Sequence, residues 1–262
     1  MAKLHLPPRF DVLGVGISVL NLGSAKALLL QAAHTAGHLG YVTVTGVHGV
    51  VESGDSPELL AIHNKSFLTT PDGMPLVWLG RHAGHDSVDR VSGPDLLREV
   101  LAASSGSGER HFFFGGAEGV AAKLKSEAGQ RFPGVTVCGV ESPPFRELAE
   151  SELDDLVARI NEVKPHFIWV GLSTPKQEKF MHSFIKSRGH QLELGDRGLT
   201  LLGVGAAFDF YTGRAPQAPL FIQRSGFEWF FRLCTSPRRL WRRYLKIVPV
   251  FLWRVLPSLV RD

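Results

Sequence analysis

The chain has little cysteine and no long apolar run, and both absences narrow what it can be. Its 262 residues include two cysteines, Cys138 and Cys234, too far apart along the chain to suggest a disulfide framework or a metal site. No uninterrupted apolar stretch reaches the roughly 18 residues that a transmembrane helix needs. The N-terminal residues MAKLHLPPRFDVLGVG lack a long apolar segment with a cleavage site. We therefore predict a cytoplasmic protein without a signal peptide.

Several common catalytic signatures are also missing. The sequence has neither a GxSxG nucleophile elbow nor a phosphate-binding P-loop. His48 and His63 show no metal-ligand spacing to other histidines, cysteines or carboxylates. We therefore predict no metal site and no cofactor.

The charge is unevenly distributed along the chain. Hydrophobic residues make up 44% and charged residues 21% of the sequence, as is typical of a globular protein. The net charge is only +4, yet the segment from residue 224 onward contains nine basic residues and two acidic ones. This asymmetry indicates an anionic partner such as nucleic acid, phosphate or a membrane surface.

Short apolar segments alternate with helical patterns along most of the chain. The expected strands are 40–46, 110–116, 135–140, 166–172 and 199–210, and the expected helices are 24–37, 56–66, 93–106, 117–134, 151–165 and 175–189. The alternation predicts an α/β fold with a mostly parallel sheet and helices on both faces. Proline and glycine cluster near 213–219. We therefore expect a catalytic domain at 1–218 and a basic, aromatic-rich helical appendage at 219–262.

One carboxylate, Asp72, lies on a Pro-Asp-Gly corner within the stretch TTPDGMPLVW. A turn alone explains the pattern, because proline favours its first corner position, aspartate bonds its own backbone and glycine accepts a positive φ. A carboxylate on a rigid corner is also suited to act as a general base. The residues themselves leave both interpretations open.

Glycine-rich or polar corners follow several of the expected strands. In a parallel sheet these corners share one edge and can converge on one crevice. Gly115 and Gly116 are expected to open a helix, where they either bind phosphate or form a tight turn. Lys176 and Gln177, in the sequence PKQE, form either a polar clamp for a sugar or phosphate or a charged first turn. The stretch GVGAAFDF matches a dinucleotide fingerprint only loosely.

The tail FEWFFRLCTSPRRLWRRYLKIVPVFLWRVL mixes aromatic residues with arginine. Arginine binds phosphate and pyrophosphate in bidentate geometry, and a basic amphipathic helix with interfacial aromatics binds membrane surfaces. A solvated helix packed on the domain is the plainer alternative. No nucleic-acid-binding motif is present, so we predict no nucleic-acid partner. At helical spacing one broad face can hold the arginines Arg232, Arg239, Arg242 and Arg243.

These sequence elements, taken in order, resemble those of a known protein family. The chain reads TTPDGMPLVW, DRVSGPDLL, FFFGGAEGVA, FPGVTVCG, KPHFIWVGLSTPKQEKF, GVGAAFDFYTGRAP and FEWFFRLCTSPRRLWRRYL in sequence. This series resembles the WecG/TagA/CpsF family of bacterial glycosyltransferases (glycosyltransferase family 26) over most of the chain. The resemblance implies a Rossmann-like fold.

The same resemblance implies a reaction and its place in the cell. Members move a sugar from a UDP-sugar donor to a polyprenyl-diphosphate-linked saccharide acceptor, in cell-surface or exopolysaccharide biosynthesis. They invert the anomeric configuration and need no metal. The implied location is peripheral, on an anionic membrane surface at the cytoplasmic face of the inner membrane. The resemblance leaves the oligomeric state undecided, with a homo-oligomer as one alternative.

The resemblance also assigns residues. It implies that Asp72 is the general base, within a catalytic set that includes Thr45, Arg90 and Gln177. It implies that arginines of the tail hold the nucleotide diphosphate. Together with the corners described above, the expected substrate-binding set is His48, Gly115, Gly116, Lys176, Gly205, Asp209, Arg214, Arg232, Arg239 and Arg242.

The sequence departs from the family pattern beside Thr45. It reads TGVH, which places Val47 where many members have asparagine, followed by His48. Either a sugar contact has moved to His48 or it has been lost, so the donor sugar stays open among UDP-glucose, UDP-N-acetylmannosamine and its uronic acid. A lost contact also favours an alternative function. The chain would then be a catalytically inactive nucleotide-sugar-binding module that docks a membrane pathway partner.

Overall fold

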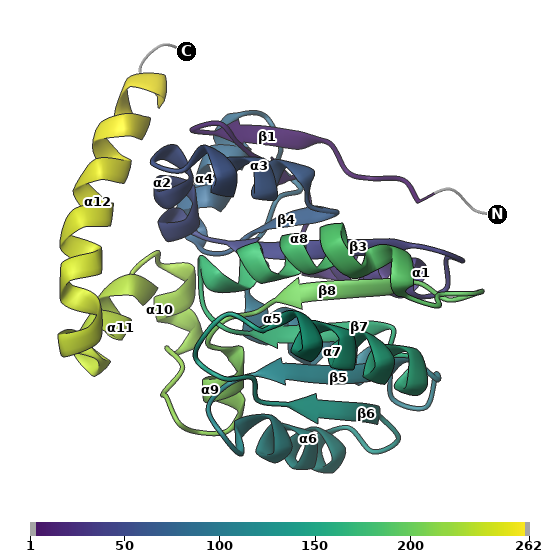
Figure 1. The fold of residues 1–262 in the computed structure, drawn as a ribbon. Coiled ribbons are helices and arrows are strands. Elements are labelled where there is room, and N and C mark those ends of the chain that lie inside the picture. Colours follow the sequence, from purple (N-terminus) through teal and green to yellow (C-terminus); the bar gives the residue numbers. More distant parts are fainter. Residues whose placement is uncertain (1–3, 260–262) are drawn as a thin grey trace.

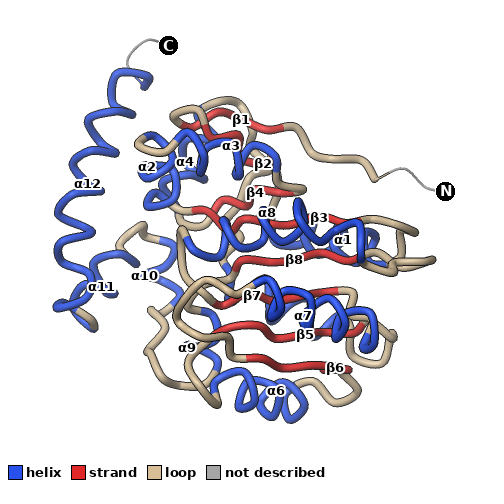
Figure 2. The backbone as a smooth tube through the Cα atoms, viewed as in Figure 1, coloured by secondary structure: helices blue, strands red, loops and turns tan. Residues whose placement is uncertain are grey.

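The computed structural model describes residues 4–259 and shows a six-stranded parallel sheet with helices on both faces (Figures 1 and 2). Neighbouring strands follow the order β4-β3-β8-β7-β5-β6. The strands are β3 (Leu39–Thr45), β4 (Leu68–Pro71), β5 (Arg110–Gly115), β6 (Thr136–Glu141), β7 (Phe167–Gly171) and β8 (Leu199–Gly203). The predicted Rossmann-like α/β fold is confirmed.

Side chains from the central strands are buried on both faces of the sheet. Phe113 belongs to the core on one face, whereas Phe112 and Phe114 belong to the core on the other. Successive residues of a strand point to opposite faces, so a strand covered twice must be apolar throughout. One face of the sheet packs against α1 (Leu22–Ala33), α5 (Gly93–Ala103), α6 (Val120–Arg131) and α9 (Ala207–Tyr211). The other face packs against α7 (Glu150–Val163) and α8 (Lys176–Arg188). A 3₁₀ turn (Gly189–Gln191) follows α8.

A smaller unit lies beside the β4 edge of the sheet. It contains an antiparallel hairpin and three helices, namely β1 (Arg9–Val12), β2 (Val15–Ser18), α2 (Val47–Gly54), α3 (Pro57–Lys65) and α4 (Met74–His82). The stretch FDVLGVGISV, residues 10–19, has the pattern of a strand or short hairpin, and the hairpin is present, but the sequence pattern did not predict α2, β4 or α4. These elements matter because α2 and α4 begin at the carboxyl ends of β3 and β4.

The strand expected at 199–210 is too long. It ends at Gly203, and Gly205 then adopts a φ of 55° that turns the chain. The residues that follow form the short helix α9. The apolar sequence around this turn is typical of a strand, and glycine is the only residue type in it that indicates a turn.

The C-terminal residues form three further helices, α10 (Leu220–Arg224), α11 (Glu228–Thr235) and α12 (Pro237–Leu259). The arrowheads of the parallel strands in Figure 1 point toward these helices. α12 runs alongside α2 and buries Ile247, Phe251 and Val255 in the core that it shares with the hairpin, α2 and α4. Outside that core, Arg254 pairs with Asp55 at 3.1 Å.

None of the helices within residues 4–259 combines the length and apolar character that crossing a bilayer requires. The predicted helical appendage is present. The predicted boundary between residues 218 and 219 stays a prediction.

Replacing Phe251 by alanine is expected to lower the free energy of unfolding by about 3 kcal/mol. The Phe251 side chain is 6% exposed, whereas the neighbouring Leu252 is 51% exposed. Leu252→Ala is therefore the matched control, and it should change the free energy by less than about 0.5 kcal/mol. Urea denaturation measures both variants. Equal effects would contradict the packing of α12 on the domain.

Candidate functional site

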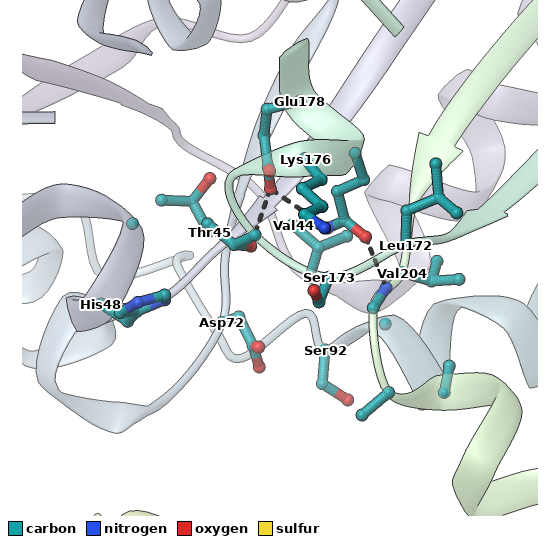
Figure 3. A pocket seen from close by; sticks show the side chains of 18 of the residues that line it. Val44, Thr45, His48, Asp72, Ser92, Leu172, Ser173, Lys176, Glu178 and Val204 are labelled. Carbon is teal, nitrogen blue, oxygen red and sulfur yellow. Dashed lines mark hydrogen bonds between the residues drawn. The ribbon is translucent and has the colours of Figure 1, made fainter. Parts of the chain in front are cut away.

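A cleft of about 1930 Å³ opens at the carboxyl edge of the sheet. Its walls combine the corners that follow β3, β4, β7 and β8 with side chains of α11 and α12. Figure 3 shows Thr45, His48, Asp72, Ser92 and Ser173 around this space. The structure therefore brings most of the predicted site residues together. Those that line the cleft are Thr45, His48, Asp72, Arg90, Gly116, Lys176, Gln177, Gly205, Asp209, Arg214 and Arg232.

Asp72 lies in the turn that joins β4 to α4. Its backbone N–H donates to the Thr45 carbonyl oxygen at 2.9 Å, which ties the end of β4 to the end of β3. Gly73 follows with a φ of 106°, as the Pro-Asp-Gly pattern predicts. A Cβ on Gly46 would lie 2.8 Å from the Asp72 carbonyl oxygen. A glycine is therefore needed for the two corners to approach so closely.

The surroundings of Asp72 favour its protonated form more than water does. Burial raises the pKa of Asp72 to about 6, while the positive charges of Arg90 and Arg232 oppose this rise. Among the described side chains, none donates a hydrogen bond to the Asp72 carboxylate. A half-buried carboxylate with a pKa near neutrality, free to accept a proton, is suited to general-base chemistry.

Arg90 joins the edge of the sheet to the C-terminal helices. Its guanidinium donates to Asp95 at 2.8 Å and to Glu228 of α11 at 2.9 Å. The Ser92 hydroxyl also donates to Asp95, at 2.6 Å. Burial acts to lower the pKa of Arg90, but three neighbouring carboxylates, including Asp72, raise it above its ordinary value. Arg90 therefore stays charged and fixes the start of α11 beside Asp72.

Thr45 ends β3 and is buried beside His63. The Thr45 Oγ1 lies 3.1 Å from the His63 Nδ1. Burial lowers the pKa of His63 to about 4, so its ring is neutral at pH 7. His63 therefore holds the Thr45 hydroxyl at the wall of the cleft.

Gln177 and Glu178 form a buried network in the first turn of α8. Gln177 is 2% exposed, accepts from the Gly205 N–H at 3.0 Å and donates to Glu178 at 3.1 Å. Glu178 also accepts from the Thr174 hydroxyl at 2.9 Å. Burial raises the pKa of Glu178. Gln177 thus holds the corner after β8 against α8, while Lys176 beside it lines the cleft.

His48 lies in the first turn of α2, at the wall of the cleft. Its Nε2 is 2.7 Å from a carboxylate oxygen of Glu52, one helical turn away. A hydrogen bond from His48 lowers the pKa of Glu52, and Arg243 and Lys246 of α12 lower it further. The sugar contact proposed for His48 stays a prediction.

The two glycines at the end of β5, Gly115 and Gly116, differ from expectation. Gly115 does not line the cleft, because it packs in the sheet, where a Cβ would lie 2.7 Å from the Gly171 backbone. The Gly116 N–H donates to the Gly171 carbonyl oxygen at 3.0 Å. The prediction that these glycines open a helix is wrong, since α6 begins at Val120.

The arginines of the tail do not share one helical face. α11 ends at Thr235 and α12 begins at Pro237, so Arg232 lies on a different helix from the others. Arg232 lines the cleft, whereas the Arg242 guanidinium lies over the Trp241 ring at 5.2 Å and does not. The side chain of Arg239 lies outside the part of the chain that the structure describes.

Two tail residues of the site were not predicted as site residues. Arg243 lines the cleft, and Glu228 both lines it and binds Arg90. The signal for Glu228 was present in the sequence, as an isolated carboxylate in a strongly basic segment. Asp209 and Arg214, which also line the cleft, lie 3.7 Å apart as an ion pair.

Metal ligands are not clustered in this structure. Within the described residues, no three histidine, cysteine, aspartate or glutamate side chains gather so that they could hold a metal ion. The cations that line the cleft are side chains of the protein, principally arginine and lysine.

Comparison with known proteins identifies the family of the chain. The family model described as "Glycosyl transferase WecG/TagA/CpsF family" matches residues 10–262. The chain is 29% identical over 205 residues to the N-acetylglucosaminyldiphosphoundecaprenol N-acetyl-beta-D-mannosaminyltransferase of Bacillus spizizenii strain W23, covering 78% of this chain and 74% of that protein. The protein of the same name from Bacillus subtilis strain 168 is 28% identical over 178 residues, covering 68% and 64%.

Proposed function

Because this chain belongs to the WecG/TagA/CpsF family of glycosyl transferases, we propose that it transfers a sugar from a UDP-sugar to a saccharide carried on polyprenyl diphosphate. The names of its relatives specify N-acetylmannosamine as the transferred group and N-acetylglucosaminyldiphosphoundecaprenol as the acceptor. The observation that carries the proposal is the Asp72 carboxylate at the wall of a large cleft that arginines of the tail also line.

Asp72 acts as the general base in this proposal. Its carboxylate takes the proton of the acceptor hydroxyl as that oxygen attacks the anomeric carbon of the donor sugar. The new glycosidic bond forms while the bond from the anomeric carbon to the UDP oxygen breaks. General-base assistance of this kind typically contributes about 10²–10⁴-fold in rate.

The arginines of the cleft balance the charge of the leaving group. The departing UDP carries negative charge on its diphosphate, and a positive side chain that is already oriented stabilises it as it develops. Arg232, Arg243 and Arg214 line the cleft and are the residues we assign to this role. In this reaction they replace a metal ion, so the proposed transferase is metal-independent.

The proposed displacement proceeds in one step and inverts the anomeric configuration. A single attack from the face opposite the leaving group converts an α-linked UDP-sugar into a β-linked product. The beta linkage in the relatives' name is consistent with such a product. Asp72 is used as a base and not as a nucleophile in this scheme.

We propose that the tail also holds the protein at the cytoplasmic face of the membrane. Large apolar side chains of α10 and α12 face solvent, among them Phe221, Leu245 and Trp253, the last being 77% exposed. Basic residues accompany them along α12. Apolar and basic groups together are what an anionic bilayer surface binds. The lipid-linked acceptor would be presented at that surface.

Release of UDP by the purified full-length protein tests the proposed function. The donors are UDP-glucose, UDP-N-acetylglucosamine, UDP-N-acetylmannosamine and its uronic acid, each with a short-chain lipid-diphosphate N-acetylglucosamine in detergent. Every reaction is run with and without EDTA. The expected result is release from one donor that depends on the acceptor and is unchanged by EDTA.

Three other outcomes would correct the proposal. Loss of activity in EDTA would overturn metal independence. Retention of the anomeric configuration in the product, determined by NMR, would overturn the single displacement. UDP binding without turnover for any donor would favour the inactive binding module.

A vesicle assay tests the membrane contact separately. The full chain is expected to sediment with vesicles that contain anionic phospholipid and to remain in solution with neutral ones, because arginine supplies part of the affinity. Trp253→Ser should weaken sedimentation without changing UDP binding. Equal binding to both vesicle types would contradict the electrostatic contribution.

A further inference from the structure

Ser173 has a backbone conformation that serine rarely adopts. It lies between β7 and α8 with a φ of 68°, in the left-handed region. This conformation is costly for a residue with a Cβ, and it persists only where the surrounding structure imposes it. Such outliers cluster at functional sites. The position of Ser173 therefore calls for an explanation.

The segment around Ser173 is fixed on both sides. The Ser173 carbonyl oxygen accepts from the Gln177 N–H at 3.0 Å. On the strand side, the Gly171 carbonyl oxygen accepts from the Gly116 N–H at the same distance. Next to Ser173, the Thr174 hydroxyl is committed to Glu178. The backbone of Ser173 is thus held in place from both directions.

The side chain of Ser173 is uncommitted by contrast. Its hydroxyl is exposed in the cleft and has no hydrogen-bond partner among the described residues. Figure 3 shows its hydroxyl pointing toward the side of the view on which Asp72 and Ser92 lie. A strained backbone therefore directs a free hydroxyl into the cleft that holds the proposed base.

We propose that the Ser173 hydroxyl binds a polar substituent of the transferred sugar and so helps to select the donor. The inference rests on the proposed function. It follows from the direction of the side chain, since the reacting anomeric carbon must lie near Asp72, and a hydroxyl that points toward Asp72 faces the sugar rather than the nucleoside. The charged diphosphate is left to the arginines assigned above, Arg214, Arg232 and Arg243. A hydroxyl can both donate to and accept from a sugar hydroxyl or an acetamido group.

Two substitutions at this position separate binding from strain. Ser173→Ala removes the hydroxyl and keeps the left-handed backbone cost. Ser173→Gly removes both. Each should lower kcat/KM for the preferred UDP-sugar by about 3–10-fold, the loss of one neutral hydrogen bond. Only Ser173→Gly should raise the melting temperature, by about 2 °C.

The measurements are turnover with the preferred UDP-sugar, calorimetric binding of UDP alone, and thermal unfolding. UDP alone should bind both variants as it binds the unchanged protein, because it lacks the sugar. Ser87→Ala is the matched control. Ser87 is exposed in the loop between α4 and α5, does not line the cleft, and has a hydroxyl without a hydrogen-bond partner among the described residues, so its substitution should leave all three quantities unchanged.

Each contrary result has a distinct meaning. Normal kcat/KM in Ser173→Ala would overturn the role of the hydroxyl. Weaker binding of UDP alone would place the contact on the diphosphate and overturn the sugar assignment. A melting temperature that does not rise in Ser173→Gly would show that the backbone at Ser173 is not strained. If the unchanged protein released no UDP from any donor, the proposed function itself would fail, and the Ser173 assignment with it.

Discussion

Asp72→Asn is expected to lower turnover by about 10²–10⁴-fold and to leave the binding of UDP unchanged. The amide keeps the size of the side chain but cannot take a proton from the acceptor hydroxyl. Steady-state UDP release and calorimetric UDP binding measure the two effects. Asp196→Asn is the matched control, since Asp196 is exposed in the turn before β8, at the opposite edge of the sheet. Normal turnover in Asp72→Asn would refute the assignment of the base.

The pH dependence of the reaction follows from the same carboxylate. Because the pKa of Asp72 is about 6, the base is ionised above that pH and protonated below it. Turnover should therefore rise with pH, reach half of its maximum near pH 6 and level off about one pH unit higher. A profile that stays flat between pH 5 and pH 7 would contradict Asp72 as the base.

The same pKa makes a prediction about stability. Burial holds the pKa of Asp72 above its ordinary value of 3.8, so ionisation costs the folded state free energy. The contribution of the neutral carboxyl is present in full below pH 3.8 and is lost as the pH rises through about 6. At pH 8, Asp72→Asn should therefore melt no lower than the unchanged protein. A lower melting temperature of Asp72→Asn at pH 8 would contradict the conclusion that burial raises the pKa of Asp72.

Arg90→Met should destabilise the protein by about 3–5 kcal/mol, because it leaves Glu228 without its cation and leaves Asp95 with Arg98, at 3.4 Å, as its remaining ion-pair partner. Arg90 is 10% exposed and binds both Asp95 and Glu228. The substitution keeps the length of the side chain and removes its charge. Urea denaturation measures the loss, and UDP release should fall with it, since α11 is no longer held beside Asp72.

A double-mutant cycle isolates the link between Arg90 and Glu228. Glu228→Gln keeps an oxygen that can accept from Arg90 and should cost less than Arg90→Met. The two substitutions together should destabilise the protein by less than the sum of their separate effects, because they share one interaction. Additive effects would show that Arg90 does not hold α11.

The fold could be predicted from sequence where elements are long and strongly patterned. The apolar strands around Phe113 and Trp169 and the helices that follow them were predicted because a doubly covered strand must be apolar throughout. β4 was missed because it has four residues and ends in proline. α2 was missed because its two glycines, Gly49 and Gly54, weaken the helical pattern.

The site could be predicted in part, for a related reason. Asp72 and Gly205 lie just after strand ends and Gln177 lies at the start of the helix that follows β7, and in a parallel sheet these positions share one edge. The partners of these residues come from distant parts of the chain, so no local sequence pattern indicates which residues they contact. The pairing of Arg90 with Glu228 spans 138 positions. The break between α11 and α12, which separates Arg232 from Arg243, also depends on how the tail packs on the domain.

The contact between Arg90 and Glu228, with the packing of α12 on the hairpin core, has a consequence during synthesis of the protein. A chain emerges from the ribosome with its N-terminal part first. The sheet and Asp72 are therefore translated before one wall of the cleft. A nascent chain stalled before Glu228 would carry Asp72 without Arg232 and Arg243, which line that wall. Under the proposed function, sugar transfer has to wait until the tail has been translated and has packed on the domain.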